Sequence, residues 1–157
     1  IIGRQGAILI GIDLKKDRQV LESAYDDEAG VTARFNLNAL RHMNRKLGTD
    51  FDLMAFQHCA VWVEEQSRIE MHLVSTRDQV VHLGDEAVAI GRNEHLLTEC
   101  CHKYTPETFA SLAAEAGLAV RQVWTDSDQL FSVQLLEPAA VQAQAHSTQS
   151  VGSPQLS

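Results

Sequence analysis

A change in the spacing of apolar residues, partway along the chain, constrains the fold more than any other feature of this sequence. Upstream of it, residues 32–47 place apolar side chains at roughly helical intervals before Gly48, which predicts a helix with a glycine stop. Downstream, the interval shortens to two, so that Ile69, Met71 and Leu73 fall on one side of a strand. We expect these strands to form one antiparallel meander. The predicted strands are residues 58–63, 68–75, 79–83 and 87–91, with one more within 93–104.

The sequences on either side of this block have a different pattern. Residues 7–14 are apolar and rich in β-branched side chains, and because the run does not alternate it predicts a buried strand of the parallel-sheet type. A helix over residues 16–25 is expected to follow. Residues 105–107 (Thr-Pro-Glu) supply a capping hydroxyl, a proline at the first helical position and an acid in the first turn, which predicts a helix ending at Gly117. Two last strands are expected at residues 119–124 and 130–136.

Composition narrows the range of functions. The 157 residues carry a formal net charge of −8 and the 13 lysines and arginines are scattered, which argues against a nucleic-acid partner. No apolar stretch approaches the length of a membrane span and no signal-peptide pattern opens the sequence, so we expect no membrane partner. Three cysteines, two of them adjacent, fit a cytoplasmic protein better than a disulfide framework. Residues 138–157 are mainly Ala, Gln and Ser and predict a disordered tail.

Five strings, in order, carry a resemblance to a known family. They are LIGIDLKKD, LESAYDDEAGVTARFNLNALRHMNRKLGTDFD, FQHCAVW, RIEMHLVS and TECCHKYTPETFASLAAEAGL with its closing VWTD. From Ala7 to Glu137 the sequence resembles the L-histidine Nα-methyltransferases of ergothioneine biosynthesis. The resemblance implies an enzyme that uses S-adenosyl-L-methionine (SAM) as cofactor and trimethylates the α-amino group of L-histidine to hercynine.

The resemblance also implies an α/β fold. It would be the C-terminal part of a class I, Rossmann-like methyltransferase sheet, interrupted by an α+β substrate-binding insertion that contains the meander. Residues 1–15 would hold a late parallel strand, residues 16–104 the insertion, and residues 105–137 the last helix and a terminal β-hairpin. Because the sequence opens with Ile and runs almost directly into a strand, we expect a fragment whose SAM-binding residues lie upstream. Alone, such a fragment should be inactive and poorly soluble or partly unfolded, whereas the full-length protein is expected to be a monomer.

Five residues take substrate-binding roles from the resemblance. Tyr25, in the AYDD string, would bind the substrate carboxylate, and Glu99, in TECCHK, would bind the imidazole. Cys101 stands where the family usually has a serine that also contacts the imidazole. Phe35 and Met71 would lie near the substrate pocket. No nucleophile of the protein is required, because the methyl transfer is direct.

The expected chemistry suits these residue types. A carboxylate such as Glu99 accepts an imidazole N–H and favours the protonated ring, and on a strand Glu99 and Cys101 share one face. An α-amino group, with a reference pKa of about 7.7–8.0 in a peptide, can be partly neutral near neutral pH, so most of the catalysis can come from holding the reacting atoms about 3–3.5 Å apart. A thiol is a weaker donor and acceptor than a hydroxyl, so Cys101 predicts looser imidazole binding or a different preferred ligand.

Simpler interpretations remain open for these residues and for the function. Glu99 can be an ordinary exposed carboxylate, Tyr25 a residue at the rim of the core, and Met71 and Phe35 core residues. The function can be that of a same-family methyltransferase for another amine or imidazole, or of a non-catalytic amino-acid-binding module. An upstream glycine-rich SAM loop would distinguish the enzyme from the binding module.

A short run of cysteine and histidine superficially resembles a metal site. Its members are His95, Cys100, Cys101 and His102. Adjacent strand residues face opposite sides, so Cys100 and Cys101 cannot easily share one ion, and we expect no metal.

Overall fold

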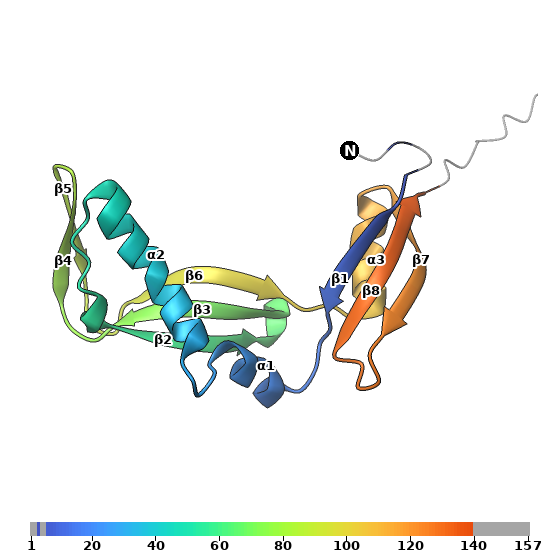
Figure 1. The fold of residues 1–157 in the computed structure, drawn as a ribbon, viewed down its shortest axis with the longest axis horizontal. Coiled ribbons are helices and arrows are strands. Elements are labelled where there is room, and N and C mark those ends of the chain that lie inside the picture. The colour runs from blue at the N-terminus through green and yellow to red at the C-terminus, as the bar shows by residue number, and fades with distance from the viewer. Residues whose placement is uncertain (1–2, 4–5, 140–157) are drawn as a thin grey trace, which may run out of the picture.

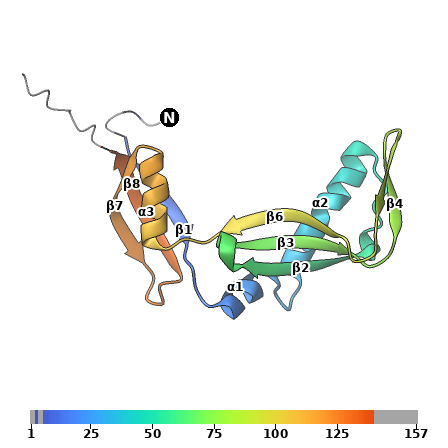
Figure 2. The same ribbon diagram turned by 180° about the vertical axis from the view of Figure 1, so that it is seen from behind.

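The computed structural model describes residue 3 and residues 6–139, which form a mixed α/β structure with antiparallel sheets. Two lobes lie side by side along the longest axis of the molecule (Figure 1). We call residues 6–14 and 105–139 the terminal lobe, and residues 15–104, which lie between them in sequence, the central lobe. Two segments of chain connect the lobes, as the view from behind also shows (Figure 2).

The terminal lobe is a three-stranded sheet with one helix on one face. Its strands are β1 (Ile8–Asp13), β7 (Leu118–Thr125) and β8 (Phe131–Pro138), in the order β1-β8-β7 with both pairings antiparallel. The helix α3 (Pro106–Glu115) packs on this sheet through Phe109 and Ala113, which share a core with Ile12, Leu14 and Leu136. The apolar stripe of the helix and alternate strand residues therefore bury one another.

Strand β1 differs from its prediction in pairing and burial. It pairs with β8, which runs antiparallel to it. Within the described residues the only parallel pairing nearby is a single bridge between Leu14, just after the strand, and Tyr104. Leu9 is 65% exposed and Ile10 is 36% exposed, so the strand is not buried on both faces. An uninterrupted apolar run specifies an extended strand, but it does not specify which element pairs with that strand or covers its second face.

The central lobe combines two helices, a three-stranded sheet and a separate hairpin. The helices α1 (Arg18–Tyr25) and α2 (Val31–Leu47) come first, and two 3₁₀ turns follow, at Leu53–Ala55 and at Glu64–Gln66. The three-stranded sheet has the order β2-β3-β6, all antiparallel, and β4 pairs only with β5. The strands are β2 (Phe56–Val63), β3 (Arg68–Ser75), β4 (Gln79–Leu83), β5 (Glu86–Ile90) and β6 (His95–His102).

The prediction of one continuous meander is therefore wrong in one respect. The strands fall at the predicted places, but β4 and β5 form their own two-stranded hairpin at the far end of the lobe, and β6 returns to pair with β3 (Figure 1). Hydrophobic alternation sets which side of a strand is buried, whereas the partner of a strand depends on where the connecting turns direct the chain.

One face of the β2-β3-β6 sheet is covered by α1 and α2. Along β3, Ile69, Met71 and Leu73 are 0%, 3% and 0% exposed, which confirms the predicted alternation. Leu21 of α1 packs against Ile69 and Met71, and Leu40 of α2 packs against Leu73. The helices thus lie over the side of the sheet that carries the predicted substrate-binding residues.

Capping interactions set the helix ends. Asp17 accepts hydrogen bonds from the backbone of Gln19 and Val20, at 2.8 and 3.3 Å, so α1 begins two residues later than predicted. Gly48, with φ of 68°, ends α2 as predicted. The predicted start of α3 is confirmed: the Thr105 hydroxyl accepts from the backbone N–H of Thr108, with Pro at the first position of the helix.

The end of the sequence falls only partly within the described residues. Pro138 belongs to β8, and the backbone N–H of Ala139 donates to the carbonyl of Gly117 at 2.8 Å, so the predicted disordered tail does not include these two residues. Residues 140–157, the rest of that predicted tail, lie outside the described part. Among the helices that the structure describes, none is long and apolar enough to cross a membrane.

Candidate functional site

A four-residue polar cluster lies where the two lobes meet. The Tyr25 hydroxyl, at the end of α1, donates to the sulfur of Cys101 on β6 at 2.9 Å. The Lys103 ammonium donates to the Tyr25 hydroxyl at 2.6 Å and to the Cys101 sulfur at 3.1 Å. The same ammonium forms an ion pair with Asp13, at the end of β1, at 2.7 Å. Two of the predicted residues, Tyr25 and Cys101, are therefore in direct contact, and the cluster joins them to the terminal lobe.

The charges of this cluster stabilise each other. Burial lowers the pKa of the Lys103 ammonium, but hydrogen bonds to Asp13, Tyr25 and Cys101 outweigh it, so the pKa is raised overall. Burial raises the pKa of Asp13, and the hydrogen bonds from Lys103 and Lys16 outweigh that effect and hold the pKa below its ordinary value. Burial also raises the pKa of the Tyr25 hydroxyl, as does its bond to Cys101, with Lys103 opposing both. Near neutral pH, Lys103 is charged, Asp13 is ionised and Tyr25 keeps its proton.

A groove of about 470 Å³ lies between α2 and β6. Glu99 from β6 and Phe35 from α2 line it. Glu99 pairs with Met71 and Cys101 pairs with Ile69 across the β3–β6 ladder, so both side chains lie on the helix-covered face, as predicted for a strand. The other lining residues are Asn36, Asn38, Ala39, His42, Met43 and Thr98.

A bulge in β6 lies at the position of Glu99. Met71 pairs with Glu99 and His72 with Leu97, so Thr98 is the extra residue, and its hydroxyl donates to the carbonyl of Met71 at 2.8 Å. Bulges change the direction of the side chains beside them and recur next to binding sites. Here the bulge comes immediately before the alternating residues Glu99, Cys101 and Lys103.

Met71 and Phe35 occupy different environments. Met71 is 3% exposed and belongs to the core beneath Tyr25, so the simpler interpretation as a core residue holds for it. Phe35 is 67% exposed on the wall of the groove, and a core role does not hold for it within the described residues. An exposed aromatic side chain on a groove wall can pack against a bound ring.

Two residues that sequence analysis did not single out support the backbone of Tyr25. The His58 ring nitrogen Nε2 lies 2.7 Å from the Tyr25 carbonyl, and Nδ1 lies 3.0 Å from the amide nitrogen of Asn36. The Asn36 amide nitrogen also donates to the carbonyl of His72 at 3.3 Å. An amide N–H that points at Nδ1 requires the ring proton on Nε2, which then donates to Tyr25. Hydrogen bonds from Asn36 of α2 through His58 of β2 thereby fix the end of α1.

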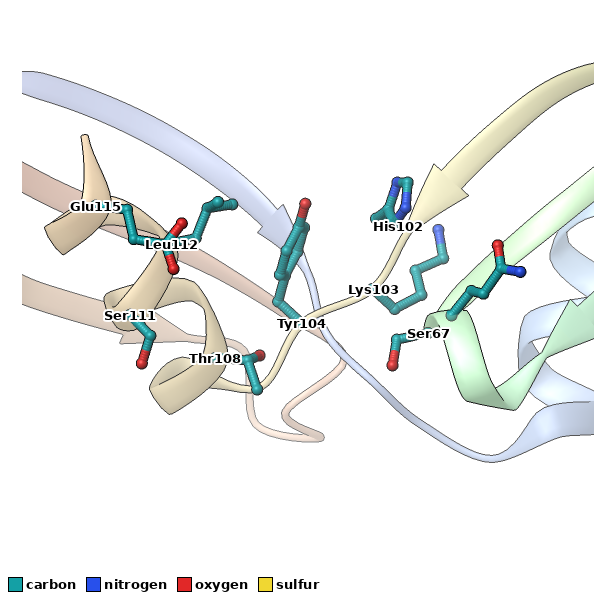
Figure 3. Close-up of a pocket in the computed structure, with 9 residues that line it drawn as sticks. Ser67, His102, Lys103, Tyr104, Thr108, Ser111, Leu112 and Glu115 are labelled. Carbon is teal, nitrogen blue, oxygen red and sulfur yellow. The ribbon is translucent and has the colours of Figure 1, made fainter.

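A second, more polar cavity of about 350 Å³ lies between the lobes. Figure 3 shows it lined by His102, Lys103 and Tyr104 on the connecting segment, with Thr108, Ser111, Leu112 and Glu115 of α3 on one side and Ser67 on the other. The Lys103 backbone N–H donates to the Ser67 carbonyl at 2.8 Å. The segment that carries Lys103 is thus fixed by backbone contacts as well as by its side chain.

The cysteine and histidine run does not converge on one point. Cys101 faces Tyr25 and Lys103, whereas Cys100 pairs with Glu70 on the opposite face of the sheet. The described part of the chain holds no group of three or more His, Cys, Asp or Glu side chains placed to bind a metal ion.

Comparison with known proteins assigns the family. A model of the family described as histidine-specific, SAM-dependent methyltransferases matches residues 1–138. This chain belongs to that family. It is 44% identical over 131 residues to histidine N-alpha-methyltransferase of Mycolicibacterium smegmatis and 43% identical over 131 residues to that of Mycobacterium tuberculosis. It is also 31% identical over 128 residues to ergothioneine biosynthesis protein 1 of Neurospora crassa.

The relatives are longer than this chain. The two mycobacterial alignments cover 82% of the chain but 41% of each relative, and the Neurospora crassa alignment covers 80% of the chain and 14% of the relative. Family members are SAM-dependent. Within the described residues no glycine-rich loop follows a strand, so we assign no residue of this chain to SAM.

Proposed function

We propose that this chain supplies the histidine-recognition part of a SAM-dependent methyltransferase that trimethylates the α-amino group of L-histidine to hercynine. The observation that carries the proposal is the gathering of Tyr25, Glu99 and Cys101 on the helix-covered face of one sheet, in a chain of the histidine-specific family. When bound elsewhere in the complete protein, SAM would supply the methyl group. The residues of this chain bind and orient the amino acid.

Each end of histidine meets a group of suitable chemistry in this proposal. The Tyr25 hydroxyl donates to the substrate carboxylate, and the Glu99 carboxylate accepts an imidazole N–H, with Phe35 beside the ring. Glu99 is exposed in the groove and makes no side-chain hydrogen bond within the described residues, so its oxygens are free for the substrate. A substrate without a ring N–H would leave that carboxylate desolvated and unpaired, which favours histidine over other amino acids.

The position of the α-amino group follows from these two contacts. Held between Tyr25 and Glu99, the amine needs only to be neutral and aligned with the methyl group, so the contribution of this chain to catalysis is positioning. We further propose that the central lobe is the substrate-binding insertion at residues 16–104. The terminal lobe would then be the end of a Rossmann-like methyltransferase sheet, whose last strands form the β7–β8 hairpin.

The test uses the complete protein that contains this chain. Incubated with SAM and L-histidine, it should yield mono-, di- and finally trimethylhistidine by mass spectrometry. Glu99→Ala should lower kcat/KM for histidine by about 100-fold or more, because a hydrogen bond to a charged group is lost at the specificity end of the substrate. Glu86→Ala, which removes an exposed carboxylate on the β4–β5 hairpin, is the matched control and should leave the rate unchanged. A folded protein that binds SAM and yields no methylated histidine contradicts the proposal.

A second candidate is methylation of a different amine or imidazole by the same site. It is favoured by the sulfur of Cys101, which is already engaged by Tyr25 and Lys103 and is a weak partner for a ring N–H. Competition between L-histidine and other imidazole amino acids, in the wild type and in Cys101→Ser, distinguishes the two. If histidine is the substrate, Cys101→Ser should lower its KM several-fold; a better competing substrate in the wild type favours the second candidate.

A further inference from the structure

Lys103 is the most deeply buried charged residue of the candidate site, and neither the family resemblance nor sequence analysis gives it a role. Its side chain is 0% exposed, although lysine is almost never buried without a partner. It follows Glu99 and Cys101 at the same alternating interval, so the alternation that puts these two residues on the helix-covered face also brings Lys103 to the cluster.

The ammonium group uses all its donors within the protein. A lysine has three N–H donors, and those of Lys103 are directed at the Asp13 carboxylate, the Tyr25 hydroxyl and the Cys101 sulfur. Lys103 therefore has no donor left for a substrate in this arrangement. Any effect that it has on substrate binding must act through one of its partners.

The contact with Tyr25 sets the direction of the tyrosine proton. A phenol oxygen that accepts a hydrogen bond from an ammonium group can still donate its own proton, and accepting makes it a stronger donor. In this structure that proton is directed at the Cys101 sulfur, which is a weak acceptor. A carboxylate is a much stronger acceptor, so a bound carboxylate draws the proton away from sulfur at little cost.

The contact with Asp13 ties this arrangement to the other lobe. Asp13 is the last residue of β1 in the terminal lobe, and it also forms an ion pair with Lys16, at 2.5 Å. The Lys103 ammonium also lies 4.4 Å from the centre of the Tyr25 ring. The position of the Tyr25 hydroxyl is thus fixed relative to the strand end of the methyltransferase sheet.

We propose that Lys103, held by Asp13, is a positioning residue that commits the Tyr25 hydroxyl to donate to the carboxylate of the amino-acid substrate. This inference rests on the proposed function, in which Tyr25 meets that carboxylate. Lys103 makes the site selective for a substrate with a free carboxylate over the same amine with that group masked. Through its ion pair with Asp13, it also couples recognition of the substrate carboxylate to the position of strand β1.

The experiment measures binding and turnover of two probes, L-histidine and L-histidinamide, by the complete protein. The variants are Lys103→Met, Lys103→Arg and the double variant Asp13→Asn/Lys103→Met, which removes the Asp13–Lys103 ion pair as a unit and leaves Lys16 an asparagine oxygen in place of the carboxylate. Lys46→Met, an exposed lysine in the last turn of α2, is the matched control. Melting temperatures show which variants are folded.

The expected result is a loss that depends on the substrate carboxylate. Lys103→Met and the double variant should raise the KM for histidine about 10-fold or more, change the KM for histidinamide less than about twofold, and leave the KM for SAM unchanged. Lys103→Arg, which keeps the charge, should recover part of the preference for histidine, and Lys46→Met should match the wild type.

Two other results have separate meanings. If the folded Lys103→Met or double variant keeps the wild-type preference for histidine over histidinamide, Lys103 has only a structural role and the inference is overturned. If the wild-type protein binds SAM but neither binds nor methylates histidine, the proposed function fails first, independently of any Lys103 variant.

Discussion

Asp27 shows how one carboxylate determines where the wall of the groove begins. Its two oxygens accept hydrogen bonds from the backbone N–H groups of Val31 and Thr32, at 2.9 and 2.8 Å, in the first turn of α2. Gly30, with φ of 64°, allows the chain to turn back so that Asp27 reaches those groups. These hydrogen bonds lower the pKa of Asp27 to about 2. The carboxylate thereby replaces intrahelical partners that the first turn lacks.

The stability contribution of Asp27 should depend on pH in the acid range. Its folded-state pKa of about 2 lies below the ordinary value of 3.8, so its stabilisation is complete above pH 3.8 and is lost as the pH falls through about 2. Asp27→Asn keeps an acceptor oxygen but cannot titrate. The difference in melting temperature between the wild type and Asp27→Asn should therefore stay constant above about pH 4 and shrink as the pH falls from there through about 2. A difference that stays constant down to about pH 2 contradicts the assignment.

The placement of a residue was predictable from sequence where it follows from a local pattern, and not where it depends on a network. The alternation that brought Glu99 and Cys101 to one face also includes Lys103, but a lysine near the end of a strand is ordinarily solvent-exposed. Its burial depends on Asp13, which is 90 residues away in sequence and was assigned to another part of the fold. No local pattern contains that pairing. The structure places Met71 in the core and Phe35 on the surface, although sequence analysis treated the two alike.

Asn44 connects α2 to the strand that follows it. Its amide nitrogen donates to the Phe51 carbonyl at 2.8 Å, and its amide oxygen accepts from the Thr49 hydroxyl at 2.7 Å and from the Phe51 backbone at 2.9 Å. One side chain thus satisfies three polar groups of the turn after Gly48. The turn directs Phe51 towards the core that contains Leu40 and Phe56.

Removing this side chain should weaken the whole central lobe. Asn44→Ala is expected to lower the free energy of unfolding by about 2 kcal/mol, because three partly buried hydrogen bonds are lost at about 1 kcal/mol each and water replaces some of them. Asn44→Asp keeps the two accepted bonds and should lose about half as much. Asn38→Ala, at an exposed position of the same helix, is the control. Urea unfolding monitored by circular dichroism measures the differences, and equal midpoints for Asn44→Ala and Asn38→Ala would refute this role.

At the scale of elements, boundaries were easier to predict than partners. Helix ends follow from side chains within a few residues, such as the Thr105 cap and the Gly48 stop, so the predicted and observed ends of α2 and α3 agree closely. Strand pairing depends on residues far apart. The β4–β5 hairpin has the same alternation as its neighbours, and only the folded chain shows that it leaves the sheet while β6 replaces it beside β3.

At the scale of the whole molecule, the sheet of the terminal lobe has one covered and one uncovered face. Helix α3 packs on the face that carries Ile12 and Leu136. The register of β1 with β8 places Leu9 and Phe131 on the other face, and the pairing of β7 with β8 adds Trp124 to it. These three side chains are 65%, 45% and 49% exposed. Such a concentration of large apolar side chains is typical of a surface that is covered in a larger assembly or a longer chain.

This surface leads to a prediction for the chain expressed alone. We expect it to associate with itself at micromolar concentration, because burying the three side chains removes apolar area from water and β1 offers a further edge for pairing. Leu9→Lys combined with Trp124→Lys should shift the chain towards monomer, whereas Val80→Lys, at an exposed apolar position on β4, should not. Sedimentation velocity over a range of concentrations measures the effect. The unmodified chain could instead sediment as a monomer at every concentration and unfold in one cooperative transition. The apolar face would then be stable in water without a covering element, and the expectation that the isolated chain is poorly soluble or partly unfolded would be wrong.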